Sequence, residues 1–221
     1  MNRNNTYIFN LSMHKVATRS IHAFIESLGY HGVHHPRWLD GYDIEAELES
    51  KGADTDELLE TIVKNWWQCE LFSDVPIPGL YREAAKAFPD SYFMLATRDP
   101  QHWWNTLRRH WRLREQPRKL DFYEYIQYAP YGYPRDRPVT KHDAEKFKTI
   151  FLTHERKVTE FFSNFNSFLK VDIDHDPVEQ KIGQFLGVNE FGDMPYLRTG
   201  NQKVGSKAAH FLYKTRGRFG L

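Results

Sequence analysis

The chain has 221 residues, 40% of them hydrophobic and 15% aromatic, which is enough apolar material for the core of a globular protein. Its 30 Lys and Arg residues nearly balance 29 Asp and Glu residues, and the resulting net charge of +1 predicts no attraction of the whole molecule to nucleic acid or to an anionic membrane. A single cysteine, Cys69, excludes an internal disulfide framework and a cysteine-based zinc cluster. The sequence shows neither a signal-peptide pattern nor a run approaching ~20 apolar residues, so we expect a cytoplasmic protein.

The first half of the chain alternates apolar runs with helical patterns. Residues 6–11, TYIFNL, are apolar at nearly every position, which predicts a strand buried on both faces. A helical spacing of apolar residues follows from Ser20 and ends at Gly29, a residue that favours helix ends. Further along, the patterns predict short strands at 31–35 and 69–76 and helices at 43–50, 54–67 and 79–88.

The second half continues the alternation around one irregular segment. Residues 92–97, YFMLAT, form the most apolar predicted strand, and a helix is predicted at 102–115. Residues 116–139 are dense in Pro, Tyr and Arg without a clear period, which predicts a long irregular insert. A long helix at about 140–163, a strand at 168–173 and a helix at 177–187 follow, and the segment from about 188 to 221 is polar and basic.

Strands that alternate with helices predict an α/β fold, a three-layer open and mostly parallel sheet with helices on both faces, as in P-loop nucleotide-binding domains. We expect residues 1–221 to form a single such domain, carrying the insert at 116–139 and the basic segment at 188–221. In these folds ligands bind beyond the carboxyl ends of the strands. The polar residues that directly follow the predicted strands are therefore the candidates for a site.

The segment after the first strand contains the run His14, Lys15, Val16, Ala17, Thr18, Arg19 and Ser20. A helix N-terminus offers unpaired N–H groups to an anion, and Lys15, Arg19 and two hydroxyl groups would add donors. The run lacks the glycines of the G-x-x-x-x-G-K-[ST] loop of ATPases. The alternative interpretation is that a hydroxyl merely caps the helix while Lys15 is solvated.

Two other strand ends carry candidate residues. Arg98 directly follows the strand at 92–97, and Thr106 lies eight residues later on the next helix, so both would face the same crevice as Lys15. The alternative for Arg98 is a surface pair with Asp99. Asp74 follows the third strand before a proline turn, a place where Asp commonly caps a helix.

These segments together resemble the nucleotide-dependent sulfotransferases. The block from Asp74 to Thr106, DVPIPGLYREAAKAFPDSYFMLATRDPQHWWNT, is similar to one branch of that family, and the resemblance extends loosely over residues 6–190. The family's first loop reads P-K-[TS]-G-T-T-[SW]; here Lys15 and the threonine Thr18 are kept, whereas the proline, the glycine and the second threonine are replaced. Its pattern of an Arg with a Ser eight residues later is matched by Arg98 and Thr106, with Thr in place of Ser.

The resemblance implies transfer of a sulfuryl group from 3'-phosphoadenosine 5'-phosphosulfate (PAPS) to a hydroxyl or amine of a small-molecule or glycan acceptor, without a metal ion. It implies that the loop 14–20 binds the 5'-phosphosulfate and that Lys15 stabilises the leaving group, while Arg98 and Thr106 hold the 3'-phosphate. Arg198 and Gly200 partly match a further 3'-phosphate element of the family. The catalytic base stays open among Asp74, His34 and His35.

Several alternatives remain at this stage. The aromatic insert is equally consistent with a lid over the acceptor, a loop packed on its neighbours, and a contact in a homodimer. A P-loop kinase or NTPase is a rival function, although the G-K-[ST] loop is missing. A non-catalytic sulfotransferase-like binding protein is the other rival, because the phosphate loop has lost its glycines.

Overall fold

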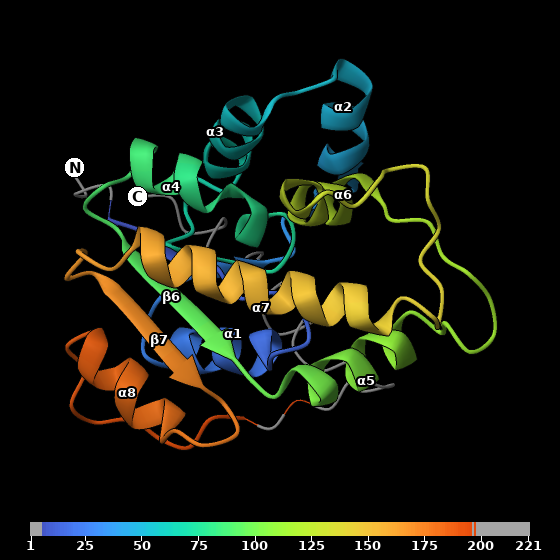
Figure 1. Ribbon diagram of the computed structural model, residues 1–221. Helices are drawn as coiled ribbons and strands as arrows, with labels where there is room; N and C mark the ends of the chain where they lie inside the picture. Colours follow the sequence, from blue (N-terminus) through green and yellow to red (C-terminus); the bar gives the residue numbers. More distant parts are fainter. Residues whose placement is uncertain (1–5, 196, 198–221) are drawn as a thin grey trace.

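The computed structural model describes residues 6–195 and residue 197, and its centre is a five-stranded sheet (Figure 1). Its strands are β1 (Ile8–Asn10), β2 (Gly32–His34), β5 (Leu71–Ser73), β6 (Tyr92–Thr97) and β7 (Phe168–Asp172). They lie in the order β2-β5-β1-β6-β7 and every pairing is parallel. Helices pack on both faces, so the predicted α/β fold class is confirmed.

The helices follow the strands as the alternation predicts. They are α1 (Thr18–Ser27), α2 (Ile44–Lys51), α3 (Thr55–Asn65), α4 (Tyr81–Ala87), α5 (Pro100–His110), α6 (Phe122–Tyr128), α7 (Ala144–Phe161) and α8 (Val178–Phe185), with 3-10 turns η1 (Ile77–Leu80) and η2 (Ala129–Tyr131). The small antiparallel hairpin of β3 (Trp38–Leu39) and β4 (Tyr42–Asp43) was not predicted. Among the described residues, no helix combines the length and the apolar character needed to cross a bilayer.

The sheet separates two apolar cores. Ile8, Leu71 and Met94 face the first core, which includes side chains of α1, α5 and α8. Phe9 and its neighbours in register, Phe72 and Phe93, face the second core with α3 and α4. Their rings stack with centroids 5.6 and 5.8 Å from that of Phe9. Because successive side chains point to opposite faces, β1 must be apolar throughout to fill both cores.

The long helix α7 contributes to both cores and crosses in front of the sheet in Figure 1. Its first half buries Phe147 and Phe151 in the first core, and its second half buries Val158 in the second. Phe151 stacks on Trp103 of α5 with ring centroids 4.5 Å apart. This packing fixes α5 against the end of β6.

The segment 116–139 is more ordered than the sequence predicted. It contains α6, whose N-terminus is closed by a capping box: Asp121 accepts from the backbone N–H of Glu124, and Glu124 accepts from that of Asp121. Tyr123, Tyr128 and Tyr133 are buried in the two cores, so the prediction of an irregular segment was wrong for this part. Its aromatic side chains are packed on the domain, as one of the three interpretations proposed.

Candidate active site

The carboxyl ends of β1, β2 and β5 meet at one edge of the sheet. Asn10 lies beside Ser73, and Ser73 lies beside His34, so the residues that directly follow these strands share one level. In Figure 1, β6 and β7 point in the same direction, and α5 begins directly after β6 at that edge. This is where ligands bind in open parallel sheets.

The loop between β1 and α1 is held by buried contacts on several sides. The Oγ atom of Ser12 accepts a hydrogen bond of 2.6 Å from the backbone N–H of Ala96 on β6. The carbonyl of His14 accepts one of 2.9 Å from Nε1 of Trp103 on α5. Val16 is fully buried in the first core. The loop is therefore fixed by its neighbours despite having no glycine.

Two residues of this loop adopt the left-handed conformation that glycine usually takes. Lys15 has a φ of 73°, and Ala17, the N-cap of α1, has φ 59° and ψ 23°. Such a conformation costs a residue with a Cβ atom roughly 1–2 kcal/mol, so the buried contacts around the loop must offset it. No side chain caps α1. Its first N–H groups and the loop amides are therefore available to an anion.

Lys15 belongs to the same loop as these amides and carries a cationic side chain. It is half-buried, and no hydrogen bond or ion pair involves its ammonium group within the described part of the chain. Burial lowers the pKa of Lys15 from its ordinary value, while the nearby Asp74 acts in the opposite direction. A half-buried ammonium group without a partner is costly, and an anion in the cleft would offset that cost.

The remaining residues of the run from His14 to Ser20 differ in their exposure and in their hydrogen-bond partners. Arg19 is exposed and unpaired among the described residues. Thr18 is buried, with Oγ1 3.3 Å from Nε2 of His34. Ser20 is engaged elsewhere, because its Oγ accepts a hydrogen bond from the backbone N–H of Leu197.

His14 is buried and faces the interior instead of the strand edge. Its Nε2 lies 3.1 Å from the hydroxyl of Tyr128, and burial lowers the pKa of His14 to about 3. The imidazole is therefore neutral near pH 7, and it positions the loop without supplying a charge to a phosphate.

His34 and Asp74 form a close pair between β2 and β5. Nε2 of His34 lies 3.2 Å from Oδ2 of Asp74, whose other oxygen accepts the backbone N–H of Val75 at 2.9 Å. Burial lowers the pKa of His34 to about 4, against the opposing effect of Asp74. Burial raises the pKa of Asp74, but the neighbouring histidines outweigh it and hold that pKa below its usual value. At pH 7 the pair therefore consists of a neutral imidazole and a carboxylate.

The side chain of His35 has different neighbours from that of His34. It adopts a left-handed φ of 61°, its ring lies against Tyr123 with centroids 6.3 Å apart, and its buried Nε2 has no hydrogen-bond partner. It lies close enough to Asp74 to influence the pKa of that carboxyl group, but no hydrogen bond joins the two in the described structure.

Arg98 lies just before α5, and Thr106 lies in the second half of that helix. One guanidinium nitrogen of Arg98 is 3.1 Å from Asp174, which follows β7, and its Nε is buried without a hydrogen-bond partner. Asp99 instead caps α5 by accepting the N–H of His102, so the alternative interpretation, a surface pair of Arg98 with Asp99, is wrong. The hydroxyl of Thr106 donates to the carbonyl of His102 at 3.0 Å and keeps its lone pairs.

Some candidates lie outside the structure, and some site residues were missed. Arg198 and Gly200 fall outside the described residues. His110 was not singled out, yet partial burial together with the charges of Lys15 and Arg118 lowers its pKa to about 4. The carboxylate of Glu124 accepts from Nε1 of Trp111 at 3.0 Å. The D-F-Y-E spacing at 121–124 was the available signal for α6 and this carboxylate.

A comparison with protein-family models identifies the family of the chain. The model of the sulfotransferase domain family matches residues 7–203. The chain belongs to this family. A crystal structure of a sulfotransferase from Alicyclobacillus acidocaldarius is similar to this chain, with 13% sequence identity, a TM-score of 0.49, and coverage of 89% of this chain and 87% of that chain. No curated protein matches the sequence. Within the described residues, no group of three or more His, Cys, Asp or Glu side chains is placed to hold a metal ion.

Proposed function

We propose that this member of the sulfotransferase family transfers a sulfuryl group from PAPS to a hydroxyl or amine of an acceptor and releases 3'-phosphoadenosine 5'-phosphate (PAP). One observation carries the proposal. The half-buried ammonium group of Lys15 has no hydrogen-bond or ion-pair partner among the described residues, and Lys15 lies two residues before the N-cap of the uncapped helix α1. That combination fits the 5'-phosphosulfate of the donor.

In the reaction, the acceptor oxygen or nitrogen forms a bond to sulfur while the bond from sulfur to the phosphate oxygen breaks. Negative charge then develops on the leaving phosphate, and Lys15 together with the loop amides stabilises it. This is mainly a matter of position and charge, as in phosphoryl transfer. The fixed loop supports the role, because preorganised donors need no rearrangement during the reaction.

His34 is the best-supported base among the three candidates. Its neutral imidazole can accept the acceptor proton, and Asp74 then stabilises the imidazolium that forms. Asp74 alone would be a weak base, because its pKa is held below the ordinary value. With Nε2 of His34 directed at Asp74, the proton would be taken by Nδ1, for which the described residues provide no hydrogen-bond partner.

Arg98 and Thr106 would hold the 3'-phosphate. The buried, unsatisfied Nε of Arg98 supports this role, since a phosphate oxygen would satisfy it. Binding there would compete with Asp174 for the guanidinium group. ADP lacks the 3'-phosphate, so the proposal predicts a clear preference for PAP over ADP.

The test is a comparison of PAP and ADP binding by thermal shift and calorimetry. At 100 times its Kd, PAP should stabilise the native state by about 2.7 kcal/mol. Lys15→Met should weaken PAP binding at least tenfold, whereas the control Lys64→Met, at an exposed lysine of α3, should not change it.

Turnover separates the remaining possibilities. His34→Gln should abolish sulfuryl transfer while keeping PAP affinity. A wild-type protein that binds PAP but transfers nothing to any acceptor would favour the non-catalytic binding protein, and a preference for ATP with Mg²⁺ would favour the kinase-like alternative. Absence of PAP binding at millimolar concentration would refute the proposal.

A further inference from the structure

The C-terminal end of α5 forms a hollow of about 280 Å³ that is rich in arginine. Its lining residues are Asn105, Arg108, Arg109, Arg112, Arg114 and Glu115. Four guanidinium groups against one carboxylate leave the wall with a formal charge of +3 (four minus one). All of these residues are polar or charged, so the hollow offers positive charge and hydrogen-bond donors, and the methylene groups of the arginine side chains add apolar surface to its wall. We call it the arginine hollow.

The helix end explains why these side chains gather. Arg108 and Arg109 follow Asn105 by three and four residues on α5, so these three side chains share one face of the helix. Arg112 then adopts a left-handed φ of 53°, and the N–H of Leu113 donates to the carbonyl of Arg108 at 2.9 Å, which closes the helix end. Leu113 is buried in the first core. The chain turns there, and Arg114 and Glu115 complete the wall.

The four arginines lack the carboxylate partners that six of the twelve arginines in the described part of the chain have. No hydrogen bond or ion pair of their side chains occurs within the described residues. Arginines elsewhere contact carboxylates, namely Arg37, Arg98, Arg118, Arg135, Arg137 and Arg156. The helix dipole favours cations in the last turn of α5, which accounts for Arg108 and Arg109. It does not account for Arg112 and Arg114, which lie beyond that turn.

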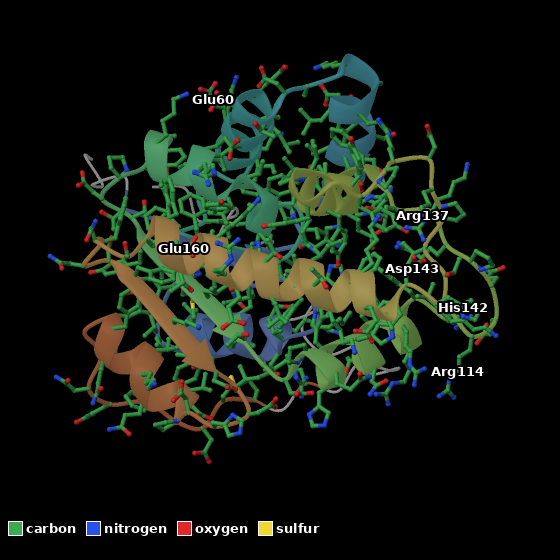
Figure 2. The ribbon with its side chains drawn as sticks, in the orientation of Figure 1. Glu60, Arg114, Arg137, His142, Asp143 and Glu160 are labelled. Atoms are coloured by element: carbon green, nitrogen blue, oxygen red, sulfur yellow. The ribbon has the colours of Figure 1, made fainter. Side chains whose placement is uncertain are left out.

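The arginine hollow shares helix α5 with a residue of the proposed PAPS site, because Thr106 directly follows Asn105 of the lining. His110 follows Arg109 on α5 and lies within electrostatic reach of Lys15, which contributes to its low pKa. Arg114 projects at the edge of the molecule beyond α5 (Figure 2). A ligand made of two or more linked units can therefore place one unit against the arginines and another unit in the cleft.

Charge and size narrow the choice of occupant. Residues 198–221 of the chain contain six Lys and Arg residues and no Asp or Glu, so this segment is not complementary to the hollow. The volume of about 280 Å³ is roughly nine times the ~30 Å³ of one water molecule in the liquid, which exceeds the need of a single inorganic anion. A wall of guanidinium groups and arginine methylene groups suits a ligand that carries both anionic groups and C–H faces, as an acidic saccharide does.

We propose that the arginine hollow binds carboxylate or sulfate ester groups of an acidic saccharide, and that this saccharide is the acceptor. Guanidinium groups match both anions with paired hydrogen bonds, and Asn105 can bond to neighbouring hydroxyl groups. The inference rests on the proposed function, because it names the class of acceptor for the reaction at Lys15 and His34.

Binding of a partly sulfated tetrasaccharide that keeps free hydroxyl groups, labelled for fluorescence anisotropy, tests the proposal in the full-length protein. We expect it to bind and to weaken with added salt, while a neutral tetrasaccharide of the same length does not bind. Arg112→Gly and Arg114→Ala should each weaken binding roughly fivefold, and the control Arg82→Ala, at an exposed arginine of α4, should leave it unchanged.

Arg112→Gly also excludes misfolding as the cause of lost binding. Glycine favours the left-handed conformation at this position, so the variant should melt at a higher temperature while binding the saccharide less tightly. Equal binding of the neutral tetrasaccharide, tighter binding of a hexaglutamate peptide, or unchanged binding by both arginine variants would overturn the inference.

PAP binding is measured in parallel and should not change in either arginine variant. If wild-type protein binds the sulfated saccharide but not PAP, the proposed function fails while the arginine hollow stands as an anion site. If it binds PAP but not the saccharide, the proposed function stands and the arginine hollow is not a saccharide site.

Discussion

Replacing Ala17 by glycine tests whether the glycine-poor loop is held under strain. Ala17 adopts φ 59° and ψ 23°, which costs an alanine roughly 1–2 kcal/mol. Glycine removes that cost but loses about 0.4–1 kcal/mol more backbone entropy on folding. The balance predicts that Ala17→Gly raises the free energy of unfolding by about 0.5–1 kcal/mol.

The assay is thermal unfolding of the ligand-free protein, with urea unfolding as a second measure. For a chain of this length the gain corresponds to a rise of about 1–4 °C in Tm. The matched control is Ala23→Gly, inside the same helix, where glycine should lower the free energy of unfolding by about 1 kcal/mol. If Ala17→Gly destabilises as much as Ala23→Gly, position 17 is not left-handed and the reasoning about the loop fails.

Three further outcomes follow from buried contacts. Trp103→Phe removes the hydrogen bond to the carbonyl of His14 and should lower the free energy of unfolding by about 1–3 kcal/mol in urea, and it should weaken PAP binding as well; unchanged values would show that this bond does not hold the loop. Gly79→Ala places a Cβ atom 2.7 Å from the carbonyl oxygen of Ile126, so we expect a loss of about 1–3 kcal/mol, and wild-type stability would contradict the packing of η1 on α6. Burial lowers the pKa of His154 to about 4, whereas its unfolded pKa is near 6.5. Between these two values the unfolded state binds more protons, so the free energy of unfolding should fall as the pH is lowered, by up to about 1.4 kcal/mol per pH unit. In His154→Gln, urea titrations from pH 7 to 4 should show a shallower fall, and an unchanged slope would refute the assignment.

Much of the fold could be predicted because the signals are local. The apolar runs of β1 and β6 and the helical spacing of α1 and α7 reflect periods of two and 3.6 residues that neighbours in sequence already contain. The predicted strands and helices agree with the structure to within a few residues. The helix predicted at 102–115 ends earlier, at His110, because Arg112 turns left-handed where only the packing of Leu113 decides the path.

The site was only partly predictable, because its geometry depends on contacts between segments that are distant in sequence. Sequence spacing identified Lys15, Asp74 and Arg98 as residues that follow strands, but it gave His34 and His35 equal standing. The register of β2 gives the two histidines different surroundings, since it pairs His34 with Ser73, and the His34 imidazole lies 3.2 Å from Asp74. His35 follows in a left-handed turn and lies against Tyr123.

The sequence by itself determined the order of strands and helices, the absence of glycine in the first loop, and the charged residues that follow each strand. The tertiary structure decided what those residues can do. It holds Ser12 against Ala96 and the carbonyl of His14 against Trp103, so that a loop without glycine keeps its left-handed turns. These contacts join residues more than 80 positions apart, and no local pattern contains them, because only the packing of β1, β6 and α5 brings them together.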